Sequence, residues 1–335
     1  MHVPSIVKRL ALGGYRRHKL LEWVYQRVHR PRPLKHYPTE LNVELTTICN
    51  ARCTFCTREK LMRSGARKPG HMDEALARHV LDRLLALTRH QGVGDSDVQF
   101  TPVGLGEPLH YPALFDVIAY ARELWPAGEI RINTNGIALD ERRARLLADS
   151  PVHTATFSLC FIDPGDHREK LGVDAHERIC ENIERFLRLR SDGRPAVTIH
   201  VFDLPENRAR YSAFAKRWLP HFGRHDLLAL PRYVPMTTRA HNGGPTCPCG
   251  QLWTTVMVDI EGYVYPCCAG VWIARDPDLC LGHIDEPFEV LLAKLEGIRQ
   301  AQLRGEYGTC ANCAYLYSFV TENRRTARRV RRGST

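Results

Sequence analysis

The chain has 335 residues, 44% of them hydrophobic and 25% charged, a composition typical of a soluble globular protein. No apolar run reaches the roughly 18 residues that a membrane-spanning helix needs, which excludes an integral helical membrane protein. The net charge of +10 comes from the two ends, because residues 1–40 hold nine Lys and Arg against two acidic residues and residues 322–335 hold six Arg against Glu322. The segment between the ends has no basic excess, so nucleic acid is not an expected partner.

The first segment, residues 1–40, is predicted to be a basic helical extension. Apolar residues recur at roughly helical spacing between residues 5 and 28, with basic residues between them. Packing on the main domain is one interpretation, and peripheral contact of this basic N-terminus with an anionic membrane surface is the other. The segment shows no apolar stretch followed by a small-residue cleavage site, so we expect no secretion signal and a cytoplasmic protein.

Strand and helix patterns alternate from residue 42 onward. Six successive strand/helix units predict a parallel sheet, because parallel strands need crossover connections. Six units are too few for a full eight-unit barrel. The predicted fold class is therefore α/β, a partial (β/α)6 TIM-like barrel over residues 41–240. The strands are expected at 42–46, 97–103, 129–135, 153–160, 196–202 and 226–234, and the helices near 73–90, 113–125, 140–149, 175–190 and 206–219.

The pattern changes after about residue 240. "HNGGPTCPCG" is a loop rich in glycine and proline, "WTTVMVDIEGYVYPC" contains two β runs around a Glu-Gly turn, and residues 287–302 have a helical pattern. We predict a small C-terminal domain of β-hairpin and helix over residues 241–320. The arginine-rich end, residues 321–335, is predicted to be a disordered tail.

Three cysteines, Cys49, Cys53 and Cys56, lie in "TTICNARCTFCT", just past the first predicted strand. Clustered cysteines in a reducing compartment are typical of metal ligands or catalytic groups. A structural zinc site needs four closed ligands, whereas a four-iron cluster held by three cysteines keeps one iron open for substrate or cofactor. The carboxyl edge of a parallel sheet is where such folds bind ligands.

The triplet resembles the signature of the radical S-adenosylmethionine (SAM) superfamily, C-x3-C-x2-C with an aromatic residue before the last cysteine, here Phe55. The resemblance implies that the three cysteines hold a [4Fe–4S] cluster whose open iron binds SAM. One electron from the cluster then cleaves SAM to methionine and a 5′-deoxyadenosyl radical, which abstracts hydrogen from the substrate. It also implies a flavodoxin- or ferredoxin-type electron donor.

Three further motifs follow successive predicted strands. "GLGEP" stands where the family has a Gly-Gly-Glu motif that binds the methionine end of SAM, and it keeps Gly104, Gly106 and Glu107, although Leu105 departs from the pattern. "TNG" and "SLCFID" stand where the family places contacts to the ribose. The resemblance therefore implies SAM contacts at Asn135 and Ser158.

A second thiol group comprises Cys249, Cys267, Cys310 and Cys313, the last two in "CANC", which is predicted to form a hairpin. Four ligands suffice for a closed site. The pattern resembles the SPASM/twitch class of the superfamily, whose small C-terminal domain holds auxiliary [4Fe–4S] clusters. No cysteine follows Cys313, so we predict the twitch form with one auxiliary cluster. A zinc ribbon is the alternative.

The expected reaction is oxidation or epimerisation of a small polar substrate, a sugar, aminocyclitol or related metabolite, with the auxiliary cluster in electron transfer. The alternatives are maturation of a ribosomally made peptide and, outside catalysis, an iron–sulfur or zinc binding protein. Cys160 and Cys268 are candidate hydrogen donors, with core packing as the plainer role for both. The candidates for substrate contact or proton transfer are His200, Asp203 and Arg232.

Overall fold

The structure, a computed structural model, describes residues 38–231, 249–272, 276–306 and 308–313. Residues 1–37 of the predicted extension, the predicted tail and Arg232 lie outside the described residues. The chain divides into two compact units. Of the described residues, unit 1 comprises 132–231, and unit 2 comprises 38–131 and those from 249 to 313. Unit 2 therefore combines the first strands of the predicted barrel with the predicted C-terminal domain.

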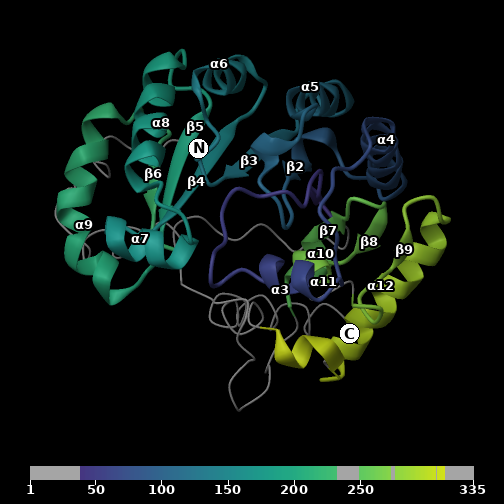
Figure 1. Cartoon of the computed structure of the whole chain (residues 1–335). Helices are drawn as coiled ribbons and strands as arrows, with labels where there is room; N and C mark the ends of the chain where they lie inside the picture. Colours follow the sequence, from purple (N-terminus) through teal and green to yellow (C-terminus); the bar gives the residue numbers. More distant parts are fainter. Residues whose placement is uncertain (1–37, 232–248, 273–275, 307, 314–335) are drawn as a thin grey trace. The chain divides into compact units, whose positions relative to one another are not determined.

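The sheet of unit 2 is built around β1, which is paired on both sides (Figure 1). Leu41 lies opposite Phe100 of β2 and Val256 of β7, and both pairings are parallel. Strands β8 and β9 extend the sheet in antiparallel fashion beyond β7. The strands are β1 (Glu40–Val43), β2 (Gln99–Pro102), β3 (Glu129–Thr134, which pairs with β2 at its start), β7 (Thr255–Val258), β8 (Tyr263–Tyr265) and β9 (Gly282–His283).

The long helices α4 and α5 of unit 2 each bury one largely apolar face. In α4 the Asp73 side chain caps the first turn by accepting hydrogen bonds from the amides of Ala75 and Leu76, and Val80 and Leu84 are fully buried one turn apart. The helices are α3 (Arg58–Arg63), α4 (Glu74–His90), α5 (Leu114–Leu124), α10 (Gln251–Thr254), α11 (Cys268–Trp272) and α12 (Phe288–Leu303).

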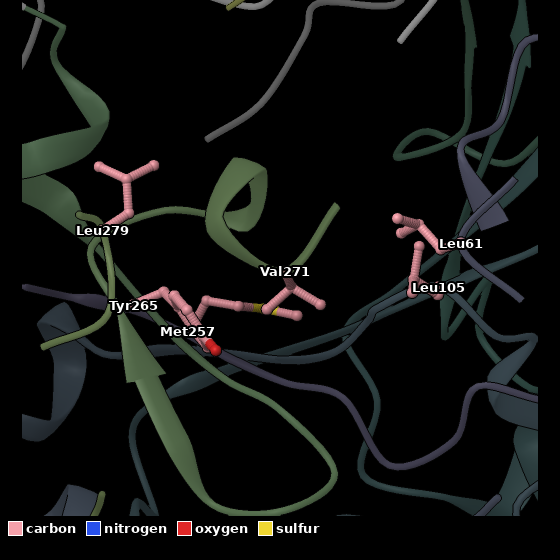
Figure 2. Close-up of a cluster of buried hydrophobic side chains, with 6 residues drawn as sticks. All are labelled: Leu61, Leu105, Met257, Tyr265, Val271 and Leu279. Atoms are coloured by element: carbon pink, nitrogen blue, oxygen red, sulfur yellow. The ribbon is translucent and has the colours of Figure 1, made fainter. Parts of the chain in front are cut away.

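A cluster of buried side chains joins the early and late segments of unit 2. Figure 2 shows Val271 on the short helix α11 pointing toward Met257, while Leu61 and Leu105 lie beside each other. Burial of such side chains is the main favourable term in folding. The cluster comprises Leu61, Leu105, Met257, Tyr265, Val271 and Leu279.

In the part of unit 1 that the structure describes, helices pack against one face of the parallel strands β4, β5 and β6. Phe157 of β4 contacts Phe186 of α8, with ring centroids 5.9 Å apart. Because side chains alternate along a strand, Ser158 faces away from the side that α8 covers. The elements are β4 (Thr154–Cys160), β5 (Ala196–Val201), β6 (Leu227–Ala229), α6 (Glu141–Asp149), α7 (Pro164–Leu171), α8 (His176–Leu189) and α9 (Pro205–Trp218).

The predicted strands and long helices are present, with ends displaced by a few residues. The first strand begins at Glu40 and ends at Val43, earlier than predicted. The hairpin predicted for "CANC" is wrong, because residues Gly308–Asn312 form a 3-10 helix. Helices α3, α7, α10 and α11 were not predicted. Of the helices in the described ranges, none combines the length and hydropathy needed to cross a membrane.

Candidate active site

Two threonines hold the cysteine loop that follows β1. The Thr46 hydroxyl accepts a hydrogen bond from the Ile48 amide at 2.9 Å and donates one to the Gly70 carbonyl at 3.2 Å. The Thr47 hydroxyl donates to the Lys68 carbonyl at 2.8 Å and accepts from the Gly70 amide at 2.9 Å. The start of the loop is therefore fixed to residues 68–70 through hydrogen bonds made by its own side chains.

Backbone amides point at two of the three sulfur atoms in this loop. The Ala51 amide donates to Cys49 Sγ at 3.5 Å and the Arg58 amide to Cys56 Sγ at 3.4 Å. Burial raises the pKa of Cys49 to about 11 and also raises the pKa of Cys56, while these amides oppose the rise. Half-buried sulfurs with amide donors suit thiolates bound to iron, whose potential depends on such hydrogen bonds. Cys49, Cys53 and Cys56 therefore fit a cluster site.

The Gly104–Glu107 turn is hydrogen-bonded to the cysteine loop. The Gly106 amide donates to the Thr46 carbonyl at 3.1 Å, and the Glu107 amide donates to the Ile48 carbonyl at 2.8 Å. A Cβ at Gly106 would lie 2.4 Å from the Thr46 oxygen, so only glycine fits there. Glu107 also raises the pKa of Cys49. The structure thus brings together two motifs that lie about fifty residues apart in the sequence.

Leu105, the departure from the family's motif, has a packing role. Its side chain belongs to the buried cluster with Leu61 and Val271, while its amide donates to Glu44 Oε1 at 2.9 Å. A Cβ at Gly104 would lie 2.3 Å from Cγ of Glu44. Gly104 is therefore required by close approach to a buried side chain, and Leu105 faces the apolar cluster instead.

Glu44 and Arg67 form a buried ion pair that the sequence analysis missed. Arg67 Nη2 donates to Glu44 Oε2, and Arg67 Nη1 donates to the Val271 carbonyl at 3.4 Å. The Ile260 amide also donates to Glu44 Oε2, at 3.4 Å. Burial raises the pKa of Glu44, and Arg67 opposes the rise. The sequence did contain one sign of a buried charge, because Glu44 interrupts the apolar residues of "VELT" at the end of the first predicted strand.

The second set of cysteines lies in the C-terminal part of unit 2. Burial raises the pKa of Cys249 to about 12, with Cys313 and Cys310 adding to the rise, and raises the pKa of Cys267, with Cys268, Cys249 and Cys313 adding to it. These effects indicate that the four predicted ligands and Cys268 lie near one another. The Cys249 amide donates to the buried Gln302 side chain at 2.9 Å.

Two predicted SAM contacts, Asn135 and Ser158, and two substrate candidates, His200 and Asp203, lie in unit 1. Ser158 is paired with His200 in the parallel register, so both side chains lie on the same face of the sheet. Burial lowers the pKa of His200 to about 4, which makes the imidazole neutral at pH 7. Asn135 Oδ1 accepts from the Ile137 amide at 2.9 Å in its own turn. Asp203 pairs with Arg208 at 2.7 Å.

Cys160 ends β4 at a register shift and has a φ of +64°. Its thiol is buried, and its Sγ donates to the Ser158 carbonyl at 3.4 Å. The side-chain Nδ2 of Asn207 donates to the carbonyls of Cys160 and Phe202, and Asn207 Oδ1 accepts from the Ile162 amide at 2.9 Å. Asn207, a polar residue in a predicted helix, is a second positioning group that the sequence analysis missed.

Replacement of Gly106 by alanine should lower the free energy of unfolding by about 1–3 kcal/mol, because the added methyl group meets a backbone oxygen that cannot rotate away. Gly297→Ala is the matched control, since nothing lies within 4 Å of its added methyl group in α12, and it should be neutral or stabilising. Denaturant unfolding of both variants measures the difference. Equal behaviour of the two variants would contradict the close contact.

Glu44→Gln should cost about 3–5 kcal/mol of folding free energy, because it leaves the Arg67 guanidinium buried without a countercharge. The double variant Glu44→Gln/Arg67→Met should recover a large part of that loss. Glu141→Gln, which removes an exposed pair with Arg145, is the control and should leave the unfolding midpoint unchanged. A double variant that is no more stable than Glu44→Gln would argue against the ion pair.

Comparison with known proteins identifies two regions. The Radical SAM superfamily profile matches residues 43–216, and the SPASM profile, an iron-sulfur cluster-binding domain, matches residues 247–314. A GTP 3',8-cyclase from Mycobacterium marinum (strain ATCC BAA-535 / M) is 30% identical over 197 residues, which is 58% of this chain and 46% of that protein. The chain therefore aligns with less than half the length of this relative.

Two solved structures share the fold. BtrN in complex with AdoMet and 2-DOIA gives a TM-score of 0.53 at 18% identity, over 84% of this chain and 93% of that chain. Native anSMEcpe with bound AdoMet and Kp18Cys peptide gives 0.53 at 16% identity, over 78% of this chain and 83% of that chain. The predicted α/β fold, a TIM-like partial barrel with a SPASM-type C-terminal region, is confirmed. The chain therefore belongs to the radical SAM superfamily, with SAM, a SAM-binding [4Fe–4S] cluster and an auxiliary cluster as its cofactors.

Proposed function

We propose that this radical SAM enzyme abstracts hydrogen from a small polar substrate, a sugar, aminocyclitol or related metabolite, and thereby oxidises or epimerises it. The observation that carries the proposal is the composition of one face of β4 and β5. Within these two strands that face presents hydroxyl groups, one imidazole and one alanine methyl group, with no lysine or arginine. Its side chains are Thr154, Thr156, Ser158, Ala196, Thr198 and His200.

The charge state of this face favours hydroxyl groups over phosphates. A neutral His200 can donate one hydrogen bond and accept another, which matches a sugar or cyclitol hydroxyl. A phosphate or triphosphate would instead call for Arg or Lys donors. A purine nucleotide, the kind of substrate named for the GTP 3',8-cyclase relatives, is therefore a poorer fit to these strands.

The cofactor residues are assigned by motif and by the contacts of unit 2. Cys49, Cys53 and Cys56 hold the first cluster. Gly104, Gly106 and Glu107 receive the methionine end of SAM, next to the loop to which their amides are hydrogen-bonded. By motif, SAM contacts are also assigned to Phe55, Asn135 and Ser158, which leaves the other side chains of the β4 and β5 face for the substrate. When bound, the clusters and SAM supply the one-electron chemistry, and the protein binds, orients and shields the substrate.

The four cysteines of the C-terminal region suit a fully ligated cluster used for electron transfer. Cys313 adds to the raised thiol pKa of Cys249, of Cys267 and of Cys310, and Cys249 adds to that of Cys267, which supports a close grouping. Their layout is also similar to that of 2-deoxy-scyllo-inosamine dehydrogenase. A flavodoxin- or ferredoxin-type protein supplies the reducing electron, and the cytoplasm is the matching compartment.

Peptide maturation is the alternative reaction. It is favoured by the fold shared with anSMEcpe, whose structure carries a bound peptide. The two possibilities are distinguished by offering peptides and small polar compounds to the same enzyme preparation and measuring which of them it turns over.

Anaerobic, reduced enzyme should release 5′-deoxyadenosine from SAM when offered the right member of a panel of amino sugars and aminocyclitols. The product should be two hydrogens lighter for oxidation or isomeric for epimerisation.

His200→Gln should lower turnover by about 10²–10⁴-fold if the imidazole moves a proton. Cys160→Ala and Cys268→Ala should abolish epimerisation only if one of these thiols returns hydrogen. Turnover with GTP or with a precursor peptide, and with no member of the panel, would overturn the proposal.

Reconstituted protein should bind about eight irons per chain, as two [4Fe–4S] clusters require. The double variant Cys310→Ala/Cys313→Ala should retain about four irons, because the first site keeps its ligands. Cys280→Ala is the matched control, since Cys280 packs against the same hydrophobic cluster as Cys310 and is not assigned as a ligand. About four irons in the unaltered protein, with zinc held by the C-terminal cysteines, would leave the zinc-ribbon interpretation.

A further inference from the structure

The junction of α7 and α8 in unit 1 brings together side chains that ligate metal ions. Among the residues that the structure describes, the ligand atoms of His176, Glu177 and Cys180 lie within 4.8 Å of one another. His176 and Cys180 are one helical turn apart on the same face of α8, with Nδ1 and Sγ 4.0 Å apart. The neighbouring Glu177 presents its carboxylate at the exposed side of this group.

A second histidine, His167 of α7, packs against this group. Its ring is fully buried, and its centroid lies 5.3 Å from that of His176 with the two planes 84° apart. Neither ring nitrogen of His167 has a hydrogen-bond partner, and Nε2 of His176 also has none. Buried polar atoms without partners are rare and costly, so three of them in two adjacent rings call for an explanation.

We propose that His167, His176, Glu177 and Cys180 form a zinc site. Two histidines, one cysteine and one carboxylate are the donor types that zinc takes, and four ligands complete a tetrahedral site. The residues lie outside both cysteine groups assigned to the clusters, and they belong to a different compact unit of the chain.

The separation of the two rings, and that of His176 Nδ1 from Cys180 Sγ, are close to what such a site requires. Two imidazoles bound to one tetrahedral zinc through Zn–N bonds of about 2.0–2.1 Å place their ring centroids about 5.2 Å apart. The observed centroid distance is 5.3 Å. A nitrogen and a sulfur on the same ion lie about 3.6 Å apart, and the 4.0 Å between His176 Nδ1 and Cys180 Sγ needs only a small movement. Binding through His176 Nδ1 and one ring nitrogen of His167 would give that His167 nitrogen a partner without rebuilding either helix.

A neighbouring arginine fixes the position of the Glu177 carboxylate. Arg217 donates to the Glu177 carboxylate at 2.7 Å and to Glu184 at 2.8 Å, which holds the carboxylate in place beside the group. The ion would link α7, which follows the Cys160 end of β4, to α8.

The test is metal analysis of the full-length, untagged, cluster-loaded protein after incubation with equimolar zinc and gel filtration. The unaltered protein should hold about one zinc per chain beyond its iron. Cys180→Ser, His176→Gln and His167→Gln should each lower bound zinc at least tenfold. Cys160→Ser, another buried cysteine of unit 1, and the double variant Cys310→Ala/Cys313→Ala should retain zinc. Absence of zinc from the unaltered protein would overturn the proposal, as would loss of zinc only in the C-terminal double variant.

Zinc K-edge absorption of the unaltered protein gives a readout that needs no variant to fold. One sulfur at about 2.3 Å with nitrogen or oxygen neighbours at about 2.0–2.2 Å is the expected shell. A shell of several sulfurs would place the zinc at a cysteine-rich site and would overturn the assignment.

Discussion

The carboxylate of Glu44 is the group on which the arrangement of unit 2 depends. It is fully buried, and it accepts hydrogen bonds from Arg67, from the Leu105 amide and from the Ile260 amide. These donors come from three segments: the stretch after the cysteine loop, the turn after β2, and the turn between β7 and β8. A charge held in an apolar interior tolerates little loss of its partners, so the ion pair fixes these segments relative to one another more strictly than apolar packing alone.

The same constraint explains why the motif after β2 has its particular residues. Gly104 is pressed against the Glu44 side chain, and Gly106 against the Thr46 carbonyl, so neither position admits a Cβ. Leu105, between them, faces the apolar cluster with Leu61 and Val271, where a second glycine would leave a cavity. Among these three positions, the departure from the family's motif is therefore at Leu105, whose side chain contributes to the core.

The sequence was informative where a chemical or periodic pattern was local. Period-two and helical patterns located the strands and long helices, and cysteine spacing with Phe55 indicated the family. The short helices α10 and α11 carry no amphipathic period to detect. Glu44, Arg67 and Asn207 escaped because their partners lie elsewhere in the chain, and spacing along the sequence does not reveal such pairs. The pairing of β7 with β1, which joins the C-terminal segment to the first strand, was missed for the same reason.

The thiols of this chain differ in the groups that surround them, and these groups separate their roles. Cys49 and Cys56 receive backbone amide hydrogen bonds, and the C-terminal cysteines group with one another. Cys160 is buried against its own strand, whereas Cys180 lies beside an imidazole with an unpartnered nitrogen. Amide donors stabilise a cluster-bound thiolate, and a histidine neighbour provides a second ligand for a single ion. A thiol's surroundings, rather than its burial alone, therefore decide whether it binds a cluster, binds an ion or packs as a small apolar side chain.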